Sequence, residues 1–416
     1  MNARRTPLVG WLTAEAISLT GTRVSMIAIP WLVLTTTGSA TQTGLVAFAE
    51  MGPYVVAKAA AGPVIDRIGA RSVSLAADTM SVAVVGAIPL LHHFDLLAFP
   101  MLMALVAVAG LLRGPGDGAK HALVPQIVED AAVPMERATG LAGAVERLAS
   151  TAGAAFAGVL VALIGPAQAL LVDAVSFGLS ALVLACTVRQ PSRPAGIAEV
   201  DDGYFRQLRE GWDFLRGDRV LVGIVVMVAI TNLLDQAFAA VLVPVWAKES
   251  GGGAAAIGLL FATFSAAAVL GSVLAASMAH RLPRFRTYLI AFLLCGAPRF
   301  VVLALDAPLP AVLSVAVVGG FASGFINPIL GAVIFERIPA HLIGRVTSLN
   351  TALCWALIPF GGVLGGVLVA SAGLAPALAV VGAGYFAATM LPALQPQWRE
   401  MDRRTVESSG GARRVT

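Results

Sequence analysis

Long apolar segments follow one another along the chain and restrict it to one class of fold. A helix needs roughly 20 residues to cross the apolar core of a bilayer, and every segment reaches that length. Only 12% of the residues are charged, against roughly 25% in soluble proteins. The sequence therefore predicts an all-α integral membrane protein with twelve transmembrane helices. The segments are residues 8–34, 42–62, 72–91, 96–122, 137–163, 166–187, 219–247, 254–280, 287–306, 309–335, 345–371 and 374–394.

The basic residues are distributed unevenly between the loops. Most of the 28 Lys and Arg residues lie at the N-terminus, in the C-terminal tail or in every second loop, and only Lys248 lies in an alternate loop. The positive-inside rule then places both termini in the cytoplasm. The first apolar segment follows Arg4 and Arg5 and is longer than a signal-peptide core. We therefore expect it to be retained as the first helix of a multi-pass protein of the cell (cytoplasmic) membrane.

An internal repeat divides the chain into two halves. The segment from Arg137, RATGLAGAVERLASTAGAAFAGVL, aligns with the segment from Arg345, RVTSLNTALCWALIPFGGVLGGVL. We expect an N-terminal six-helix bundle, a cytoplasmic linker, a C-terminal six-helix bundle and a disordered cytoplasmic tail. Their ranges are 1–187, 188–218, 219–395 and 396–416.

The linker contains an amphipathic pattern. Phe205, Leu208, Trp212 and Leu215 recur at helical spacing, with charged residues on the opposite face. Such a helix suits the cytoplasmic interface of the membrane. It is equally suited to packing on the protein's own surface, and the pattern does not distinguish the two.

A short charged segment, GPVIDRIGARSV at residues 62–73, separates the second and third apolar segments. We interpret it as a tight turn in which glycines allow close approach and a sharp reversal. Its pattern Gly-x-x-x-Asp-Arg-x-Gly-x-Arg resembles the loop between helices 2 and 3 of major facilitator superfamily transporters. That resemblance implies an inner-gate motif formed by Gly62, Asp66, Arg67, Gly69 and Arg71. Together with Asp78, Lys120 and Glu146 or Arg147, it predicts a salt-bridge network that latches the gate in the outward-facing state.

Further segments are similar to bacterial drug and siderophore exporters, the enterobactin-exporter-like branch of that superfamily. They are IAIPWLVLTTTGSA, LLVDAVSFGLSALVL and LREGWDFLRGDRVL. The sequence departs from the antiporter pattern Gly-Pro-x-x-Gly-Gly, because Ala154 replaces the proline. The resemblance implies two pseudo-symmetric bundles and alternating access. The small residues here also suit close packing of helices in general.

Ionisable residues inside the apolar segments identify candidate coupling sites, because each is costly to insert without a partner, water or a function. The resemblance implies that helices 1, 4, 7 and 10 line a central cavity. Asp173 and Arg299, toward helix ends or on peripheral helices, are given mostly structural roles. The proton-coupling candidates are Glu15, Glu50, Asp235 and Arg113. The alternative for these carboxylates is a salt bridge to Arg23 or Arg113.

Four residues are candidates for contact with the substrate: Arg23, Asn232, Asn327 and Trp355. For the two amides and the tryptophan, hydrogen bonds between helices and core packing remain the alternative. The adjacent His92 and His93 have no further ligands nearby in the sequence, so no metal site is predicted.

The motifs exclude several energy sources and activities. The run GPGDGAKH has Ala119 where a nucleotide-binding loop needs glycine, and no hydrolase motif is present. We therefore expect a monomeric non-enzyme with no cofactor and no nucleic-acid partner, powered by a proton gradient. The predicted function is export of an amphipathic small molecule (a drug, siderophore or secondary metabolite) by proton antiport. The alternatives are a lysophospholipid flippase, an uptake facilitator and a non-transporting sensor or scaffold.

Overall fold

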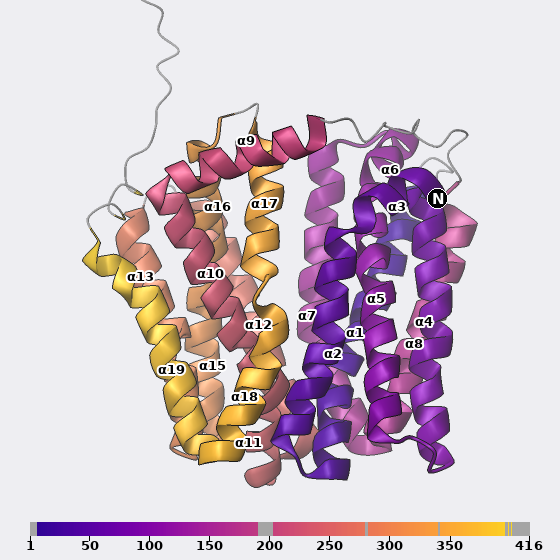
Figure 1. The fold of residues 1–416 in the computed structure, drawn as a ribbon, viewed down its shortest axis with the longest axis vertical. Coiled ribbons are helices and arrows are strands. Elements are labelled where there is room, and N and C mark those ends of the chain that lie inside the picture. Colours follow the sequence, from indigo (N-terminus) through magenta and orange to yellow (C-terminus); the bar gives the residue numbers. More distant parts are fainter. Residues whose placement is uncertain are drawn as a thin grey trace, which may run out of the picture.

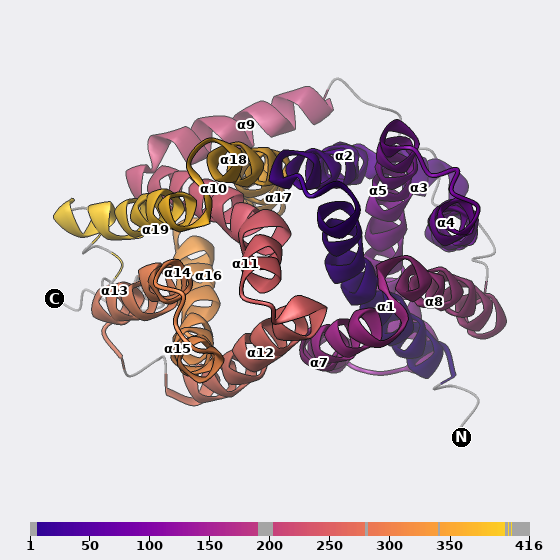
Figure 2. The ribbon, with the colours of Figure 1, turned by 90° about the horizontal axis from the view of Figure 1, so that it is seen from below.

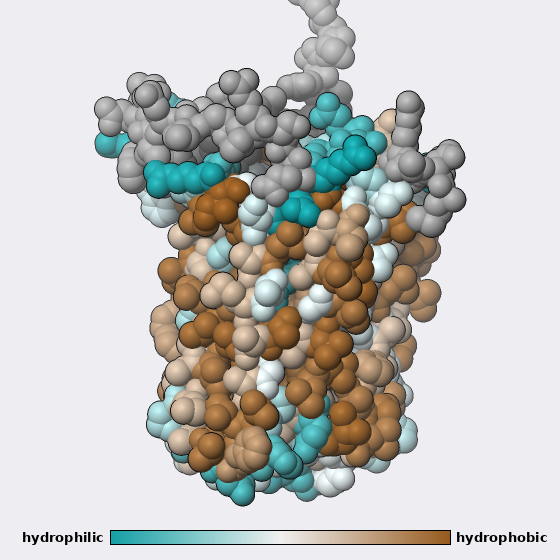
Figure 3. All heavy atoms as spheres, turned by 90° about the vertical axis from the view of Figure 1, so that its right-hand side faces the viewer, coloured by the Kyte–Doolittle hydropathy of each residue, from teal (hydrophilic) through white to brown (hydrophobic). Residues whose placement is uncertain are grey.

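A computed structural model of the chain describes residues 6–189, 203–278, 282–339 and 342–395, together with Trp398 and Met401. Within these ranges every regular element is helical. Most of the helices run side by side along one direction (Figure 1). Among the described residues, eleven helical segments are long and apolar enough to cross a membrane. Large apolar side chains such as Val56, Leu163 and Leu305 are exposed on the outside, and Figure 3 shows hydrophobic residues over most of one flank.

The first half of the chain forms mostly uninterrupted helices. α1 has 32 residues and α7 has 30. The helices are α1 (Thr6–Thr37), α2 (Ala40–Ala59), α3 (Ala61–Ile68), α4 (Ala70–His93), α5 (Phe99–Ala122), α6 (Val124–Ala131), α7 (Met135–Ile164) and α8 (Pro166–Thr187). α2 is 20 residues long but is not among the eleven apolar segments, and it carries Glu50 and Lys58.

The second half is interrupted near the middle of several segments. The break between α13 and α14 lies at Gly296, two residues before Pro298, and Pro359 is the second residue of α18 after another break. Proline lacks the N–H that would continue the backbone ladder, so both breaks have a local cause. The elements are α10 (Arg219–Ala237), the π-helix η2 (Phe238–Leu242), α11 (Val243–Glu249), α12 (Gly253–Met278), α13 (Arg284–Cys295), α14 (Ala297–Ala304), α15 (Leu309–Ser323), α16 (Ile326–Arg337), α17 (Ile343–Trp355), α18 (Ile358–Ala372), α19 (Leu374–Met390) and the 3₁₀-helix η5 (Leu391–Leu394).

The helix α9 (Gly203–Gly217) lies across one end of the bundle, and α11 lies at the other (Figure 1). We call these the α9 end and the α11 end. Leu215 of α9 is buried with Leu221 and Val346, so this helix packs on the protein's own surface. Trp212, on the same apolar face, is half exposed. The side chains of Phe205 and Leu208 lie outside the described part.

The two halves contact each other through α2 with α18 and through α7 with α12, as the view along the bundle shows (Figure 2). These seams are lined by glycine. A Cβ on Gly158 would lie 2.6 Å from the Cα of Gly258, and a Cβ on Gly44 would lie 2.2 Å from the carbonyl oxygen of Gly362. The small-residue segments of the sequence therefore do allow close helix approach.

The charged segment at residues 62–73 differs from its prediction as a turn. Residues 61–68 form the helix α3, and the chain reverses only at Gly69, whose φ is +92°. Gly62 is exposed, and a Cβ there would meet no neighbouring atom within 4 Å. The expectation that Gly62 permits close backbone approach is therefore wrong, because its helical position faces open space.

Candidate functional site

A cavity of about 510 Å³ lies between the two halves. Its volume is in the range of small-molecule sites. The N-terminal half contributes nearly all its charged groups, whereas the C-terminal half contributes apolar and uncharged polar groups. The lining includes Glu15, Arg23, Glu50, Tyr54, Lys58, Arg113, Asp117 and Glu146 from the first half, and Gln236, Phe261, Ser265 and Trp355 from the second.

Polar side chains form one stripe along α2 and a second stripe, Arg113 and Asp117, along α5, and the two stripes face each other on this cavity wall. Glu50, Tyr54 and Lys58 recur every four residues on α2, so they share one face of that helix. Arg113 of α5 donates to Glu50 Oε1 at 2.8 Å. The Tyr54 hydroxyl donates to Asp117 Oδ2 at 3.1 Å and accepts from Lys58 Nζ at 3.0 Å. The Arg113 guanidinium carbon also lies 4.7 Å from the centroid of the Tyr54 ring, so the stripes form one continuous network.

Glycines on α5 bring the stripes together. A Cβ on Gly110 would lie 2.1 Å from the carbonyl oxygen of Glu50, which no real side-chain atom could occupy. A Cβ on Gly114 would lie 2.7 Å from the carbonyl oxygen of Tyr54. Because both positions are glycine, α5 packs directly on the backbone of α2, and Arg113 reaches Glu50.

The network reaches the second half through Trp355 at the end of α17. Lys58 Nζ lies 4.5 Å from the centroid of the Trp355 ring, and Tyr54 stacks on that ring with centroids 6.2 Å apart. A cation over an indole face is attracted by the ring quadrupole. Trp355 therefore forms the aromatic wall of the cavity opposite the charges.

α1 places two further charged groups on the cavity. Arg23 donates to Ser150 of α7 at 2.7 Å, and its Nε is buried without a hydrogen-bond partner. Glu15 has one buried carboxylate oxygen, Oε2, that also lacks a partner. Buried polar atoms without partners are costly, so these two groups are suited to bind water, protons or a ligand.

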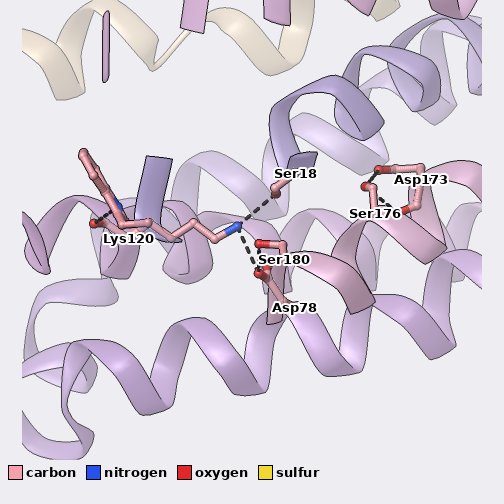
Figure 4. Close-up of polar contacts among 7 residues, drawn as sticks. Ser18, Asp78, Lys120, Asp173, Ser176 and Ser180 are labelled. Atoms are coloured by element: carbon pink, nitrogen blue, oxygen red, sulfur yellow. Dashed lines mark hydrogen bonds and ion pairs between the residues drawn. The ribbon is translucent and has the colours of Figure 1, made fainter. Parts of the chain in front are cut away.

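Behind this wall, polar side chains are buried between the helices of the first half. Lys120 lies 3.1 Å from Asp78 and donates to Ser18 at 2.9 Å, while Ser180 donates to Asp78 at 2.8 Å (Figure 4). The side chains of Lys120 and Asp78 are 3% and 4% exposed. This buried pair lies away from the lining of the central cavity.

A second cavity, of about 430 Å³, lies within the C-terminal half. It is lined by Asn232, Asp235, Arg299 and Asn327 and by several aromatic rings. Arg299 is ion-paired with Asp235. Its guanidinium carbon lies 4.7 to 4.8 Å from the centroids of three rings, those of Phe238, Phe300 and Tyr385.

The positions of the predicted site residues divide between these cavities. Glu15, Arg23, Glu50, Arg113 and Trp355 line the central one. Asp235, Asn232 and Asn327 line the second one instead.

Three of the predicted contacts can be compared directly with the structure. Asp235 is paired with Arg299, because both line the second cavity, whereas Arg23 and Arg113 line the central one. Arg299 is therefore an inward-facing partner, not a peripheral residue. Asn232 donates to the Cys354 carbonyl at 2.9 Å, which is the helix-packing alternative.

The inner-gate residues lie on the surface at the α9 end. Asp66 and Arg67 are exposed, and within the described part of the chain neither makes an ion pair. Arg71 donates to the carbonyl oxygens of Val188 and Ala185 at 2.7 and 2.8 Å. Of the expected network, the Asp78–Lys120 pair is formed in this conformation.

Sequence reasoning overlooked Tyr54 and gave no role to Lys58 or Asp117. The four-residue spacing of Glu50, Tyr54 and Lys58 was the available signal. The spacing of Arg113 and Asp117 repeats it on the facing helix. No group of three or more His, Cys, Asp or Glu residues in the described ranges could hold a metal ion.

Comparisons with known proteins agree with this architecture. A protein family described as "transmembrane secretion effector" matches residues 7–412. The chain belongs to this family of major facilitator transporters. It is 32% identical over 409 residues to a protein of Mycobacterium tuberculosis named "Multidrug efflux pump Tap", covering 96% of each chain. A protein of the same name from Mycolicibacterium fortuitum is 27% identical over 404 residues, covering 96% of this chain and 98% of that one.

Solved structures of transporters share the fold of this family member at much lower identity. The nucleoside transporter NupG superposes with a TM-score of 0.69 at 14% identity, covering 96% of this chain and 99% of that one. A bacterial homologue of the iron transporter ferroportin in an inward-facing state superposes with a TM-score of 0.71 at 14% identity, covering 94% and 98%. At such identity the likeness concerns the fold alone.

Proposed function

We propose that this protein is a secondary active transporter that exports an amphipathic small molecule in exchange for protons. The observation that carries the proposal is the central cavity between the halves, whose wall joins apolar and aromatic groups to partly buried carboxylates. Apolar surface binds the body of such a molecule, and carboxylates carry protons. The relatives named as multidrug efflux pumps support export as the direction.

In this proposal α2 also crosses the membrane, although it carries Glu50 and Lys58, and it raises the number of membrane helices to twelve. A charged residue is tolerated in a membrane helix when it faces a partner or a cavity, as both of these do. With both termini in the cytoplasm, the α9 end faces inward. One monomer in the cytoplasmic membrane then contains two six-helix bundles and a complete site between them.

In an alternating-access cycle, the protein would open the α11 end and close the α9 end. Glycine seams hold α2 against α18 and α7 against α12 in the present state. In the opposite state the α9 end closes, and Asp66 and Arg67 gain ion-pair partners there. A transport cycle of this kind requires contacts that exist in one state and are lost in the other.

Glu50 is the leading proton carrier in this scheme, with Glu15 beside it on the same cavity. Its ionised form is held by Arg113. Protonation of Glu50 would release Arg113 and change the charge of the wall that the substrate contacts. Asp235 lies in the second cavity, where its pairing with Arg299 suits a role in ligand binding.

The test uses purified protein in proteoliposomes of known orientation, loaded with fluorescent amphipathic compounds, under an imposed pH gradient of either sign. We expect compound movement opposite to the proton flux and only when a gradient is present. Asp95→Asn, in an exposed loop, serves as the matched carboxylate control. Movement that is independent of the gradient would replace this proposal by a facilitator or lipid flippase. Binding without movement would indicate a sensor or scaffold.

A further inference from the structure

Asp173 on α8 is a buried carboxylate that forms no ion pair with any described residue. The residue is 2% exposed. Its partners are hydroxyl groups. Ser25 of α1 donates to Oδ2. Ser176 donates to Oδ1 at 3.2 Å and to the Asp173 carbonyl at 2.7 Å (Figure 4). None of the ion pairs within the described residues includes Asp173.

Asp78 is a second buried carboxylate, and unlike Asp173 it has a basic partner among the described residues. Asp78 is buried to a similar degree but lies 3.1 Å from Lys120. Burying an ionised carboxylate without a compensating charge costs several kcal/mol, even after the protein relaxes. Two hydroxyl donors offset part of that cost but leave the net charge in place. The conformation seen here therefore favours a protonated Asp173 carboxyl.

A small internal void connects Asp173 to the central network. It has a volume of about 20 Å³, and its walls include Asp173, Ser25, Ser81, Glu50 and Arg113. A site of at least roughly 10–15 Å³ with several polar partners can hold one water molecule. The Glu50–Arg113 pair thus borders one side of a water-sized space, and the Asp173 carboxyl borders another.

Other charged groups near Asp173 already have partners or point elsewhere. On α4, Asp78 is bound to Lys120 and Ser180, which is seven residues farther along α8 than Asp173. On α1, Arg23 is turned to Ser150 of α7, and Glu146 of α7 lines the central cavity. Of the described residues that line the void, only Arg113 is basic.

We infer that Asp173 is a second proton-holding site and that Arg113 determines whether Glu50 or Asp173 is ionised. In the present state Asp173 is protonated and Glu50 is ionised beside Arg113. In the alternative state Arg113 turns across the void to Asp173, and one proton passes from Asp173 through the void water to Glu50. The buried cluster keeps the same net charge in both states, since one proton and one guanidinium exchange places.

The arrangement gives each carboxylate a different task. Glu50 lines the central cavity and can exchange its proton with water there, whereas Asp173 is absent from the described lining. Asp173 would therefore store the proton and Glu50 would load or release it. The link to transport rests on the proposed proton antiport, but the protonation switch itself does not.

Infrared spectroscopy of the purified, unmodified protein at neutral pH tests the switch without transport. The carbonyl stretch of a protonated carboxylic acid is separate from carboxylate bands. We expect such a band in the wild-type protein, loss of one component of it in Asp173→Asn and an unchanged band in the exposed-loop control Asp95→Asn. Other buried carboxyls such as Glu15 would contribute components that neither variant changes. An acid band of unchanged intensity in Asp173→Asn would overturn the inference.

The variant Glu50→Gln provides the sharper measurement, because it leaves Asp173 in place. The neutral amide that replaces the Glu50 carboxylate cannot hold Arg113 by charge, so Arg113 should turn to Asp173 and ionise it. We expect the acid band assigned to Asp173 to disappear. A purely structural Asp173 would keep its proton, so an unchanged band in a folded Glu50→Gln protein contradicts the switch even if Asp173→Asn fails to fold.

Transport measurements then separate this inference from the proposed function. Asp173→Asn should bind the fluorescent compound as tightly as the wild type but lose proton-driven movement. Wild-type protein that shows the band pattern but no proton coupling would refute antiport and leave the switch intact. Normal proton-driven transport by Asp173→Asn would refute the storage role.

Discussion

The two halves of the helical bundle differ in how deeply their charged side chains are buried. Within the described residues, the buried charged side chains Glu50, Asp78, Lys120 and Asp173 all lie in the N-terminal half, between mostly continuous helices. The C-terminal half instead has interrupted helices around a cavity of about 430 Å³ with the Asp235–Arg299 pair inside it. Asp235 is 41% exposed in its side chain, whereas Glu50 is 10% exposed.

From this difference we propose that the two halves have different roles in transport. Charges held between continuous, closely packed helices lie in a low dielectric, where one proton changes the local electrostatic balance strongly. Helices that break at Gly296 or before Pro359 give up backbone packing and leave room between side chains. The first half is thus suited to respond to protons, and the second to adapt to the shape of a ligand.

The largest expected contrast is between Glu50→Gln and Asp235→Asn. If the first half handles protons, Glu50→Gln should reduce pH-driven transport to background while substrate binding persists. Asp235→Asn should weaken binding but keep the response to the gradient. Transport in proteoliposomes and equilibrium binding measure the two effects. The opposite pattern would reverse the assignment of the halves.

The next contrast concerns the stability of the two ion pairs. Arg113→Leu leaves Glu50 buried without a cation and should lower the free energy of unfolding by about 3–5 kcal/mol. Arg299→Leu should cost less, because Asp235 is more exposed. Thermal unfolding in detergent measures both. The double change Glu50→Leu with Arg113→Leu should recover most of the loss, and equal losses for the two single arginine variants would argue against the contrast.

A smaller effect is expected at the α2–α5 seam of the first half. Gly110→Ala places a Cβ against the backbone of Glu50 and should destabilise the protein by about 1–3 kcal/mol through overpacking. Gly140→Ala is the matched control, since a Cβ there meets nothing within 4 Å. Unfolding of both variants in detergent tests the close approach. Equal stability would mean that α5 does not rest on α2.

Trp355→Leu tests the contribution of the second half to the central cavity. Loss of its ring removes the contacts with Tyr54 and Lys58, and with them an aromatic surface for substrate. Aromatic contacts contribute about 0.5–1.5 kcal/mol beyond area, so affinity for an aromatic compound should fall roughly two- to tenfold. Fluorescence titration measures it, with an aliphatic compound as control. A uniform loss for both compounds would indicate disturbed folding instead.

The smallest effect on stability is expected for Asp66→Asn. Asp66 is exposed and makes no ion pair within the described residues, so unfolding should change by no more than about 0.5 kcal/mol. The transport rate should nevertheless fall, because the proposed partner forms only when the α9 end closes. An unchanged rate in a well-expressed variant would remove Asp66 from the gate.

Much of the fold could be predicted from local pattern. The segment predicted at 219–247 corresponds to Arg219–Glu249, and that at 254–280 corresponds to Gly253–Met278. The interruption at Gly296 was not predicted, because hydropathy averages over a window and remains high across a break. The helix α3 was mistaken for a turn for a related reason: eight residues with three charged or proline positions carry little helical signal.

The candidate site was only partly predictable. The sequence identified which helices carry charges, since a charge in an apolar segment is conspicuous on its own. It could not assign partners, so Asp235 was considered beside Arg23 or Arg113 and Tyr54 was missed. Pairing depends on how each helix is rotated, and glycines such as Gly110 decide that through contacts with distant residues.

The sequence by itself determined a helical membrane protein, its repeat and its resemblance to a transporter family, because segment length, apolar content and motif spacing are local properties of the chain. Only the tertiary structure decided that Arg113 holds Glu50, that Arg299 holds Asp235 and that Asp173 forms no ion pair with any described residue. Those facts depend on which helix faces meet, and the meeting of faces is a property of the whole bundle.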